Sequence, residues 1–249
     1  MGAQPVRESL GSRLNAVNQR IRSAERRFGR PPDSVALLAV SKSAPAGNIL
    51  EAIQCGQTRF GESYVQEALT KMGQISAQIF AQISAQPIGK PIEWHFIGAL
   101  QSNKAKAVAR HFDWVHSVAR ADIAVRLSEH RPEGLPPLSV CLQVNISADP
   151  RKSGVALRDL PALTRAVAAL PRLSLRGLMT LPTYCEDFEV QRLPFRALRQ
   201  ARDELQQQLG IALDTLSMGM SEDFEAAIAE GATIVRVGTA IFGPRSVLC

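Results

Sequence analysis

Cysteine is one of the things this sequence has least of. Its four cysteines are scattered, and none has the spacing of a metal-binding or redox motif. Isolated cysteines of this kind are typical of free thiols in a reducing compartment, so we expect a cytoplasmic protein. The four are Cys55, Cys141, Cys185 and Cys249.

Long apolar runs are missing as well. No run approaches the roughly 20 residues that a helix needs to cross a bilayer. The opening residues, MGAQPVRESL, also lack the apolar core of a secretion signal. The sequence therefore predicts no association with a membrane.

Aromatic residues make up only 5% of the chain, although its net charge is +6. A basic chain can bind nucleic acid, but here the arginines are spread out and no nucleic-acid-binding motif is present. We expect no nucleic-acid partner. The charge remains compatible with a small ligand that carries phosphate.

What the chain does have is a regular alternation of strand-like and helical segments. Eight such pairs in 249 residues predict a single α/β domain over 1–249, a TIM-type (β/α)8 barrel. An open doubly wound sheet is the alternative, but no glycine fingerprint follows the first strand. The strand-like runs cover residues 35–42, 58–63, 92–98, 113–118, 138–147, 173–180, 212–219 and 233–240.

Two features stand outside this alternation. Apolar residues recur every three or four positions from Leu10 to Phe28, which predicts an extra amphipathic helix that closes the barrel bottom or covers a side. Glu8 and Glu25 argue against a transit peptide there. Further on, the letters QISAQ occur twice within 74–87, and we interpret them as a duplication that lengthens a surface helix.

Lysine is scarce, and one lysine stands in an unusual place. Only six of the 29 basic residues are lysine, and Lys42 ends the first strand in LLAVSK. Barrel sites lie at the C-terminal ends of the strands. A partly desolvated lysine there has a lowered pKa and can form a Schiff base with an aldehyde. The structural alternative is a lysine at the barrel rim that pairs with Glu62.

The loops after the last two strands resemble a phosphate site. In TIM barrels these loops commonly bind phosphate. In VGTAIFG, the backbone N–H groups of Gly238 and Thr239 can approach an anion closely, and Thr239 adds a hydroxyl. In SMGMSED, Ser221 is a good N-cap for the next helix and Gly231 a good stop. The simpler interpretation is that Ser221 only caps and Gly238 only turns.

Arg236 is the second unusual cation. It alternates with Val235 and Val237 along the eighth strand, so its side chain points the opposite way and needs a partner. The eighth strand neighbours the first in a closed barrel, which places Arg236 beside Lys42. It is either a salt bridge at the rim or a donor to a ligand. A lysine, a phosphate site and an arginine suit pyridoxal phosphate (PLP), or the sugar phosphate of a Schiff-base aldolase.

Motifs along nearly the whole chain resemble the PLP homeostasis protein family, which is similar to the N-terminal barrel domain of alanine racemase. The resemblance implies that Lys42 carries PLP, that Ser217 and the Gly238–Thr239 turn hold its phosphate, and that Arg236 lies beside its ring. Met218, next to Ser217, is expected to line the same site. The motifs are AVSK (39–42), FGES (60–63), WHFIGALQSNK (94–104), VNIS (144–147), KSG (152–154), RGLMTLP (176–182), LSMGMSEDFEAAIAEGAT (216–233) and VRVGTAIFG (235–243).

One position departs from the family pattern. Ser63 stands where the family usually has asparagine near the cofactor, so a direct contact from Ser63 is in doubt. With Gln66, Ser63 forms a capping box for the next helix, a role in which asparagine serves equally well. We expect Ser63 near the site.

The resemblance implies a protein that handles PLP and is not an enzyme. It would sequester the cofactor and supply it to apo-enzymes, as a monomer or weak dimer. Racemisation needs an acid/base group on each face of the cofactor, and the chain has only Tyr64 and Tyr184 to offer besides Lys42. We expect both tyrosines to pack structurally. A weak racemase-like enzyme and a PLP-free aldolase remain the alternatives.

Overall fold

Eight parallel strands form a closed barrel in the computed structural model, which describes residues 8–82, 91–147 and 149–244. Consecutive strands pair, and the eighth pairs back onto the first. The closed ring confirms the predicted barrel and excludes the open sheet. The strands are β1 (Ala36–Val40), β2 (Arg59–Glu62), β3 (Glu93–Phe96), β4 (Trp114–Val118), β5 (Leu138–Gln143), β6 (Leu173–Met179), β7 (Thr215–Ser217) and β8 (Ile234–Val237).

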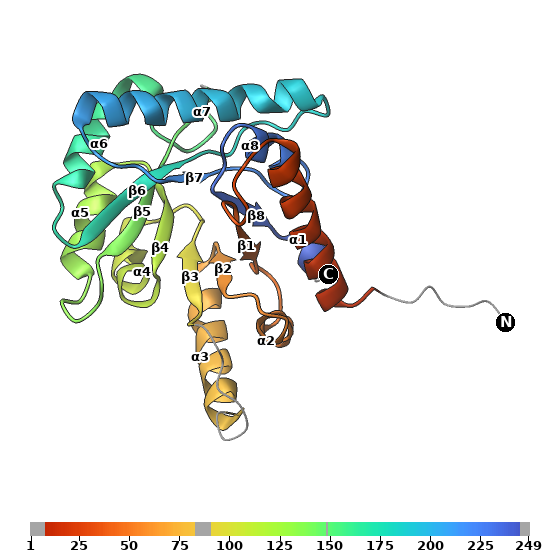
Figure 1. Cartoon of the computed structure of the whole chain (residues 1–249). Coiled ribbons are helices and arrows are strands. Elements are labelled where there is room, and N and C mark those ends of the chain that lie inside the picture. The colour runs from red at the N-terminus through yellow and green to blue at the C-terminus, as the bar shows by residue number, and fades with distance from the viewer. Residues whose placement is uncertain (1–7, 83–90, 148, 245–249) are drawn as a thin grey trace.

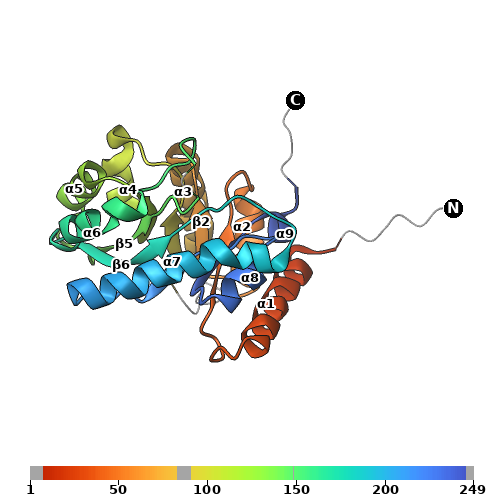
Figure 2. The same ribbon diagram turned by 90° about the horizontal axis from the view of Figure 1, so that it is seen from above.

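A helix follows each strand and lies outside the barrel (Figures 1 and 2). Strands at the centre of such a barrel read as short apolar runs because they are covered on both faces. Short 3-10 turns precede α4 and α6 at Ser102–Lys104 and Leu157–Asp159. The helices are α2 (Ala46–Gln54), α3 (Val65–Gln82), α4 (Ala105–His111), α5 (Ala121–His130), α6 (Leu160–Ala168), α7 (Phe188–Leu209), α8 (Phe224–Ala229) and α9 (Thr239–Phe242).

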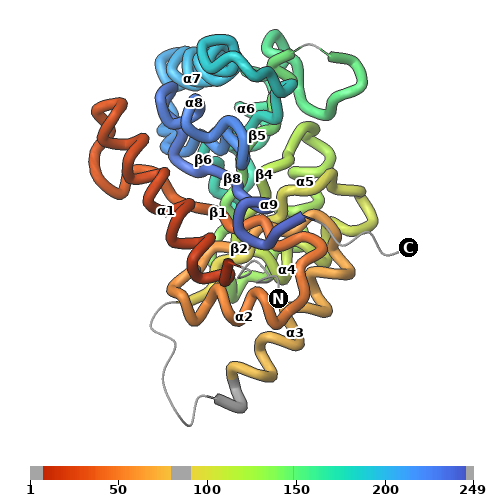
Figure 3. The backbone as a smooth tube through the Cα atoms, turned by 90° about the vertical axis from the view of Figure 1, so that its right-hand side faces the viewer, coloured from red at the N-terminus to blue at the C-terminus, as the bar shows by residue number. Residues whose placement is uncertain are grey.

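The extra N-terminal helix is α1 (Leu10–Arg27), and it covers a side of the barrel. The Ser9 hydroxyl caps it by accepting the N–H of Ser12 at 3.1 Å. Its apolar stripe packs against α2, α8 and α9, so α1 lies beside the β1–β8 junction and does not close the bottom (Figure 3). The buried members of the stripe are Leu10, Leu14, Val17, Ile21 and Ala24.

Helix α3 contains the first QISAQ copy and extends to Gln82. Most of the second copy lies outside the described residues. In the described parts of the chain, no helix combines the length and the apolar character that crossing a membrane requires.

The inside of the barrel is unusually polar. His95 of β3, His116 of β4, Ser217 of β7 and Arg236 of β8 are all at most 4% exposed. The His116 ring bonds to Ser217 although their strands are not neighbours, so the contact crosses the barrel interior. The apolar core lies instead between the strands and the surrounding helices.

Candidate functional site

A cavity of about 210 Å³ lies at the C-terminal ends of the strands. We call it the upper cavity. It brings together five of the seven predicted site residues; Ser217 and Met218 do not line it. The full lining is Val40, Lys42, Ser63, Ile97, Met179, Leu181, Met220, Ser221, Glu222, Arg236, Gly238 and Thr239.

Lys42 sits in a tight turn directly after β1. The turn closes where the N–H of Ala44 donates to the carbonyl of Ser41 at 2.9 Å. Ser43 adopts a left-handed backbone conformation, with φ of 65°. This conformation is uncommon for residues other than glycine and costs on the order of 1 kcal/mol. The turn therefore needs support from its surroundings to hold Lys42 in place.

That support comes from a buried ionic cluster under the turn, formed by Lys71, Glu62 and Glu67. The Lys71 Nζ atom lies 2.6 Å from Glu62 Oε1 and 2.8 Å from Glu67 Oε1. It also donates to the Ser41 carbonyl at 2.9 Å, while the Ser41 hydroxyl donates to Glu62 at 2.6 Å. Glu67 in turn accepts the N–H of Ser43 at 2.6 Å. The cluster thus grips the turn on both sides of Lys42.

Glu62 has an ion-pair partner within this cluster. Lys71, only 5% exposed, forms a buried ion pair with Glu62. Burial raises the pKa of the Glu62 carboxyl, and the hydrogen bonds from Lys71 and Ser41 oppose that rise. Lys71 was not among the residues predicted from the sequence. The available signal was the spacing of Glu67 and Lys71 four residues apart on α3, which places both on one helix face.

Arg236 points into the barrel and reaches the upper cavity, as its alternation with two valines predicts. Its Nη1 donates to the Ser217 hydroxyl at 2.7 Å and its Nη2 to the Thr180 carbonyl at 2.8 Å. Burial lowers the pKa of Arg236 to about 10, although the nearby Asp223 opposes the shift. The side chain therefore stays cationic at neutral pH. Leu38 of β1 is its register partner, which places Arg236 beside the strand that leads to Lys42.

Ser217 and Met218, both predicted to belong to the site, do not line the upper cavity in this structure. Ser217 is fully buried, with its hydroxyl between Arg236 and the Nδ1 atom of His116 at 2.7 Å. Met218 is fully buried in the apolar layer between strands and helices. Successive side chains on a strand face opposite sides, so Ser217 points into the barrel and Met218 toward the surrounding helices. Ser217 supports Arg236 from beneath.

The loop after β7 contributes Met220, Ser221 and Glu222 in their place. Helix α8 begins at Phe224 with Asp223 before it, so the prediction that Ser221 caps this helix is wrong. The Asp223 carboxylate instead accepts the N–H of Met220 at 2.6 Å and closes the loop. Within the described residues, neither backbone N–H of Ser221 and Glu222 donates a hydrogen bond. Both groups can therefore bind an anion.

A glycine in each of the two loops lets the backbone pass close to neighbouring residues. Gly219 has φ of 90°, and a Cβ atom there would lie 2.6 Å from the Cβ of Ala227. A Cβ atom on Gly238 would lie 3.2 Å from the Val40 carbonyl oxygen. Thr239 is the first residue of α9, and the first N–H groups of a helix have no partner within it. Thr239 lines the same cavity as Ser221.

Ser63 lines the upper cavity, as predicted, from the loop after β2. Helix α3 begins at Val65, so Tyr64 and not Ser63 directly precedes it, one residue later than the predicted capping box requires. Tyr64 and Tyr184 are 58% and 51% exposed. The expectation that both pack structurally is therefore wrong, and neither lines the cavity.

Comparison with known proteins places the chain clearly. Residues 12–246 match the family described as alanine racemase, N-terminal domain. The pyridoxal phosphate homeostasis protein of Pseudomonas aeruginosa is 51% identical over 95% of this chain and 96% of that protein. The homeostasis protein of Escherichia coli K12 is 48% identical over 95% of this chain and 97% of its own length.

A solved structure is similar as well. PipY of Synechococcus elongatus, determined with PLP bound, superposes with a TM-score of 0.79 at 36% identity, covering 94% of this chain and all of PipY. The chain belongs to the alanine racemase N-terminal domain family and, within it, to the pyridoxal phosphate homeostasis proteins.

Proposed function

We propose that this chain binds PLP in the upper cavity, as a Schiff base on Lys42, and acts in intracellular PLP homeostasis by sequestering and supplying the cofactor. The observation that carries this proposal is one small cavity lined by a lysine, an arginine and two loops with uncommitted donors. The PLP found in PipY, a relative at 36% identity, supports it. The protein would work in the cytoplasm as a monomer or weak dimer, with apo-enzymes as recipients.

The residues present fit such a ligand. PLP supplies an aldehyde that reacts with a primary amine, and a phosphate that needs donors. Lys42 offers the amine from a turn held rigidly by the Lys71 cluster. Thr239, Ser221 and the adjoining N–H groups offer donors for the phosphate. Arg236 presents a buried positive charge to the cavity, which disfavours protonation of a ring nitrogen beside it.

The same residues argue against catalysis. A racemase needs a second acid/base group on the face of the substrate opposite the lysine. Neither tyrosine of the chain lines the upper cavity, and Arg236 is held by two hydrogen bonds as a cation. An unprotonated pyridine nitrogen also withdraws electrons weakly, which limits carbanion chemistry. We therefore propose a carrier of PLP in preference to an enzyme.

An assay for turnover tests this point. We expect the PLP-loaded protein to racemise L-alanine no faster than free PLP does, because neither tyrosine is among the described residues that line the upper cavity. An apo-aminotransferase mixed with it should regain activity over time, which transfer of the cofactor explains. Racemisation at about 1 per second or faster, the ordinary enzyme range, would establish the racemase alternative. Tyr64, which is exposed close to Ser63, would then be the first base to test.

A substitution at Thr239 tests the phosphate contact. Thr239→Val removes one hydroxyl donor to an anion, a change of roughly 1.5–3 kcal/mol. PLP should bind about ten-fold more weakly or worse, whereas pyridoxal, which has no phosphate, should bind almost as before. The measurement is equilibrium binding of both ligands by absorbance. Equal weakening of both would indicate general damage to the loop and contradict the assignment.

A further inference from the structure

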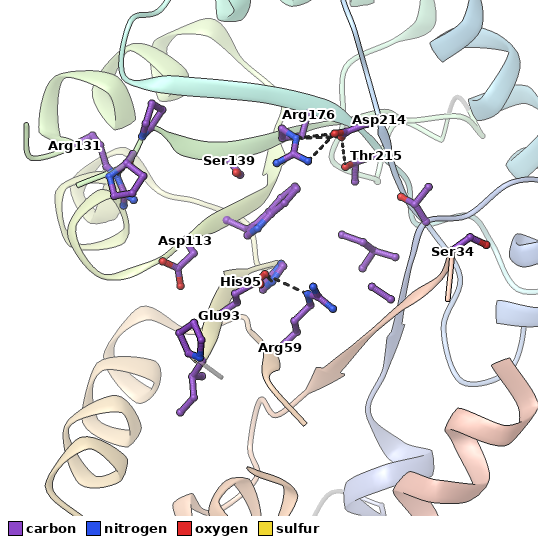
Figure 4. A pocket seen from close by; sticks show the side chains of 18 residues that line it. Ser34, Arg59, Glu93, His95, Asp113, Arg131, Ser139, Arg176, Asp214 and Thr215 are labelled. Atoms are coloured by element: carbon purple, nitrogen blue, oxygen red, sulfur yellow. Dashed lines mark hydrogen bonds and ion pairs between the residues drawn. The ribbon is translucent and has the colours of Figure 1, made fainter. Parts of the chain in front are cut away.

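A second cavity, of about 680 Å³, opens at the opposite mouth of the barrel (Figure 4). We call it the lower cavity. Its volume falls in the range of about 300–1,000 Å³ that is common for small-molecule sites. The function proposed above makes no use of it. The first residues of six strands line it: Ala36, Arg59, Glu93, Trp114, Thr215 and Ile234.

A row of hydrogen-bonded side chains connects the two cavities through the barrel. It begins at Arg236, whose Nη1 lies 2.7 Å from Ser217 Oγ. The row continues from Ser217 Oγ to His116 Nδ1 at 2.7 Å, and from His116 Nε2 to His95 Nδ1 at 2.9 Å. Arg236 lines the upper cavity and His95 the lower one.

The chemistry of the row fixes which atom donates at each step. A guanidinium can only donate, so Ser217 Oγ accepts from Arg236. The Ser217 hydrogen then has His116 Nδ1 as its acceptor, and His116 must carry its own hydrogen on Nε2 and donate to His95. Burial lowers the pKa of both imidazoles, which keeps both rings neutral. His95 therefore carries its hydrogen on Nε2.

The opposite direction of donation, from His95 to His116 and from His116 to Ser217, is disfavoured at both ends of the row. If His116 donated to Ser217, the Ser217 hydrogen would lose that acceptor in a fully buried place, which costs free energy. The lone pair of His95 Nε2 would then face the carboxylate of Glu93, whose Oε2 lies 3.5 Å away. The floor of the lower cavity thus presents a donor. That atom is buried, and its contact with the Glu93 carboxylate, at 3.5 Å, is too long for a good hydrogen bond.

Two arginines add donors at the walls. In Figure 4, Arg59 and Arg176 extend into the opening from opposite sides. Arg59 uses Nε to contact Glu93 at 3.3 Å, and Arg176 uses Nε and Nη2 to bind Asp214. Within the described part of the chain, the Nη atoms of Arg59 and the Nη1 atom of Arg176 donate no hydrogen bond.

The carboxylates of this mouth are already engaged. Glu93 contacts Arg59, Asp214 binds Arg176 and the Thr215 hydroxyl, and Asp113 accepts the N–H of Trp94. The buried Arg131, also in the lining, donates to the backbone carbonyls of Ala109, Phe112 and Pro136. These neutral acceptors leave its positive charge in place. The groups available to a ligand are mainly donors on cationic or neutral side chains.

We infer that the lower cavity is a second binding site, for a small molecule carrying an oxyanion group, either a carboxylate or a phosphate. Arg59 and Arg176 would donate to its oxygens from the walls, and His95 Nε2–H from the floor. Charge-assisted hydrogen bonds of this type are the strong ones in proteins. The site is separate from the upper cavity and does not depend on PLP binding.

Nitrogen spectra of the histidine rings test the inference on the full chain. The protein is labelled with ¹⁵N-histidine and titrated with sodium phosphate or with sodium succinate, at an ionic strength kept constant with chloride. Before any addition, His95 should be a neutral ring with its hydrogen on Nε2; the opposite tautomer would overturn the proposal. At least one probe should then shift His95 Nε2 with saturation below about 1 mM. The exposed His111 should not follow that saturation curve.

Three variants distinguish an anion in the lower cavity from an anion bound elsewhere on the protein. The double variant Arg59→Gln/Glu93→Gln leaves the net charge unchanged and should weaken the saturable shift ten-fold or more. Arg158→Gln, at a side chain 87% exposed and outside the lining, should leave it unchanged. Thr239→Val weakens a phosphate site in the upper cavity, from which a bound anion could affect His95 through the row. It should leave the shift unchanged, because the proposed anion lies in the lower cavity.

The identity of the effective probe decides between a phosphate and a carboxylate ligand. A shift that never saturates with either probe would overturn the proposal. So would a shift that Thr239→Val abolishes and the double variant retains, since that result would place the anion in the upper cavity.

Discussion

Lys42→Ala is expected to abolish covalent attachment of PLP to this chain. In the unchanged protein, borohydride reduction should fix a pyridoxyl group to the peptide that contains Lys42, because its amine is the one that lines the upper cavity. The variant should yield no labelled peptide at that position and should lose its visible absorption band. Mass mapping of the peptides after reduction measures the labelling, and an absorbance spectrum before reduction measures the band.

A matched control uses a lysine away from the site. Lys106→Ala changes an exposed residue of α4 and should leave the labelling as it is. A label that maps to Lys104 or Lys106 would show that the site assignment is wrong. The Lys42→Ala protein should also fail to restore the activity of an apo-aminotransferase, which connects the attachment to the proposed supply of cofactor.

Lys71→Met is expected to destabilise the fold by about 3 kcal/mol or more. Removing one partner of a buried ion pair costs roughly 3–5 kcal/mol, because the remaining charge stays buried without compensation. Lys71 and Glu62 have side chains only 6% and 0% exposed, so solvent cannot replace the lost contact. The free energy of unfolding, measured by urea denaturation, should fall accordingly. PLP binding should weaken too, since Lys71 also holds the Ser41 carbonyl beside Lys42.

The double variant Lys71→Met/Glu62→Gln should recover part of the lost stability, because it removes the uncompensated carboxylate. Lys106→Met, at an exposed position, is the control for the substitution itself and should change the free energy of unfolding by less than about 0.5 kcal/mol. A Lys71→Met protein as stable as the unchanged chain would show that the cluster does not support the turn.

The sequence by itself predicted the barrel and five of the residues that line the upper cavity. Strands such as β1, with the residues ALLAV, were visible as short apolar runs because both faces of a central strand are covered. Helix α1 was visible because only one of its faces is covered, which gives an amphipathic pattern. Lys42 and Arg236 could be found because each places a cation where a strand should be apolar, and strand alternation sets the direction of Arg236. The glycine at position 238 and the threonine after it follow from the barrel topology.

The tertiary structure decided the contacts that join residues far apart in the chain. Ser217 supports Arg236 and is itself bonded to His116, 101 positions away. The Lys71 cluster joins α3 to the turn after β1, 30 positions away. Local propensity and periodicity carry no information about such pairs, because the chain reaches them only when the barrel closes. The same holds for Ser221, since the position of Asp223, and not the residue type of Ser221, sets where α8 begins.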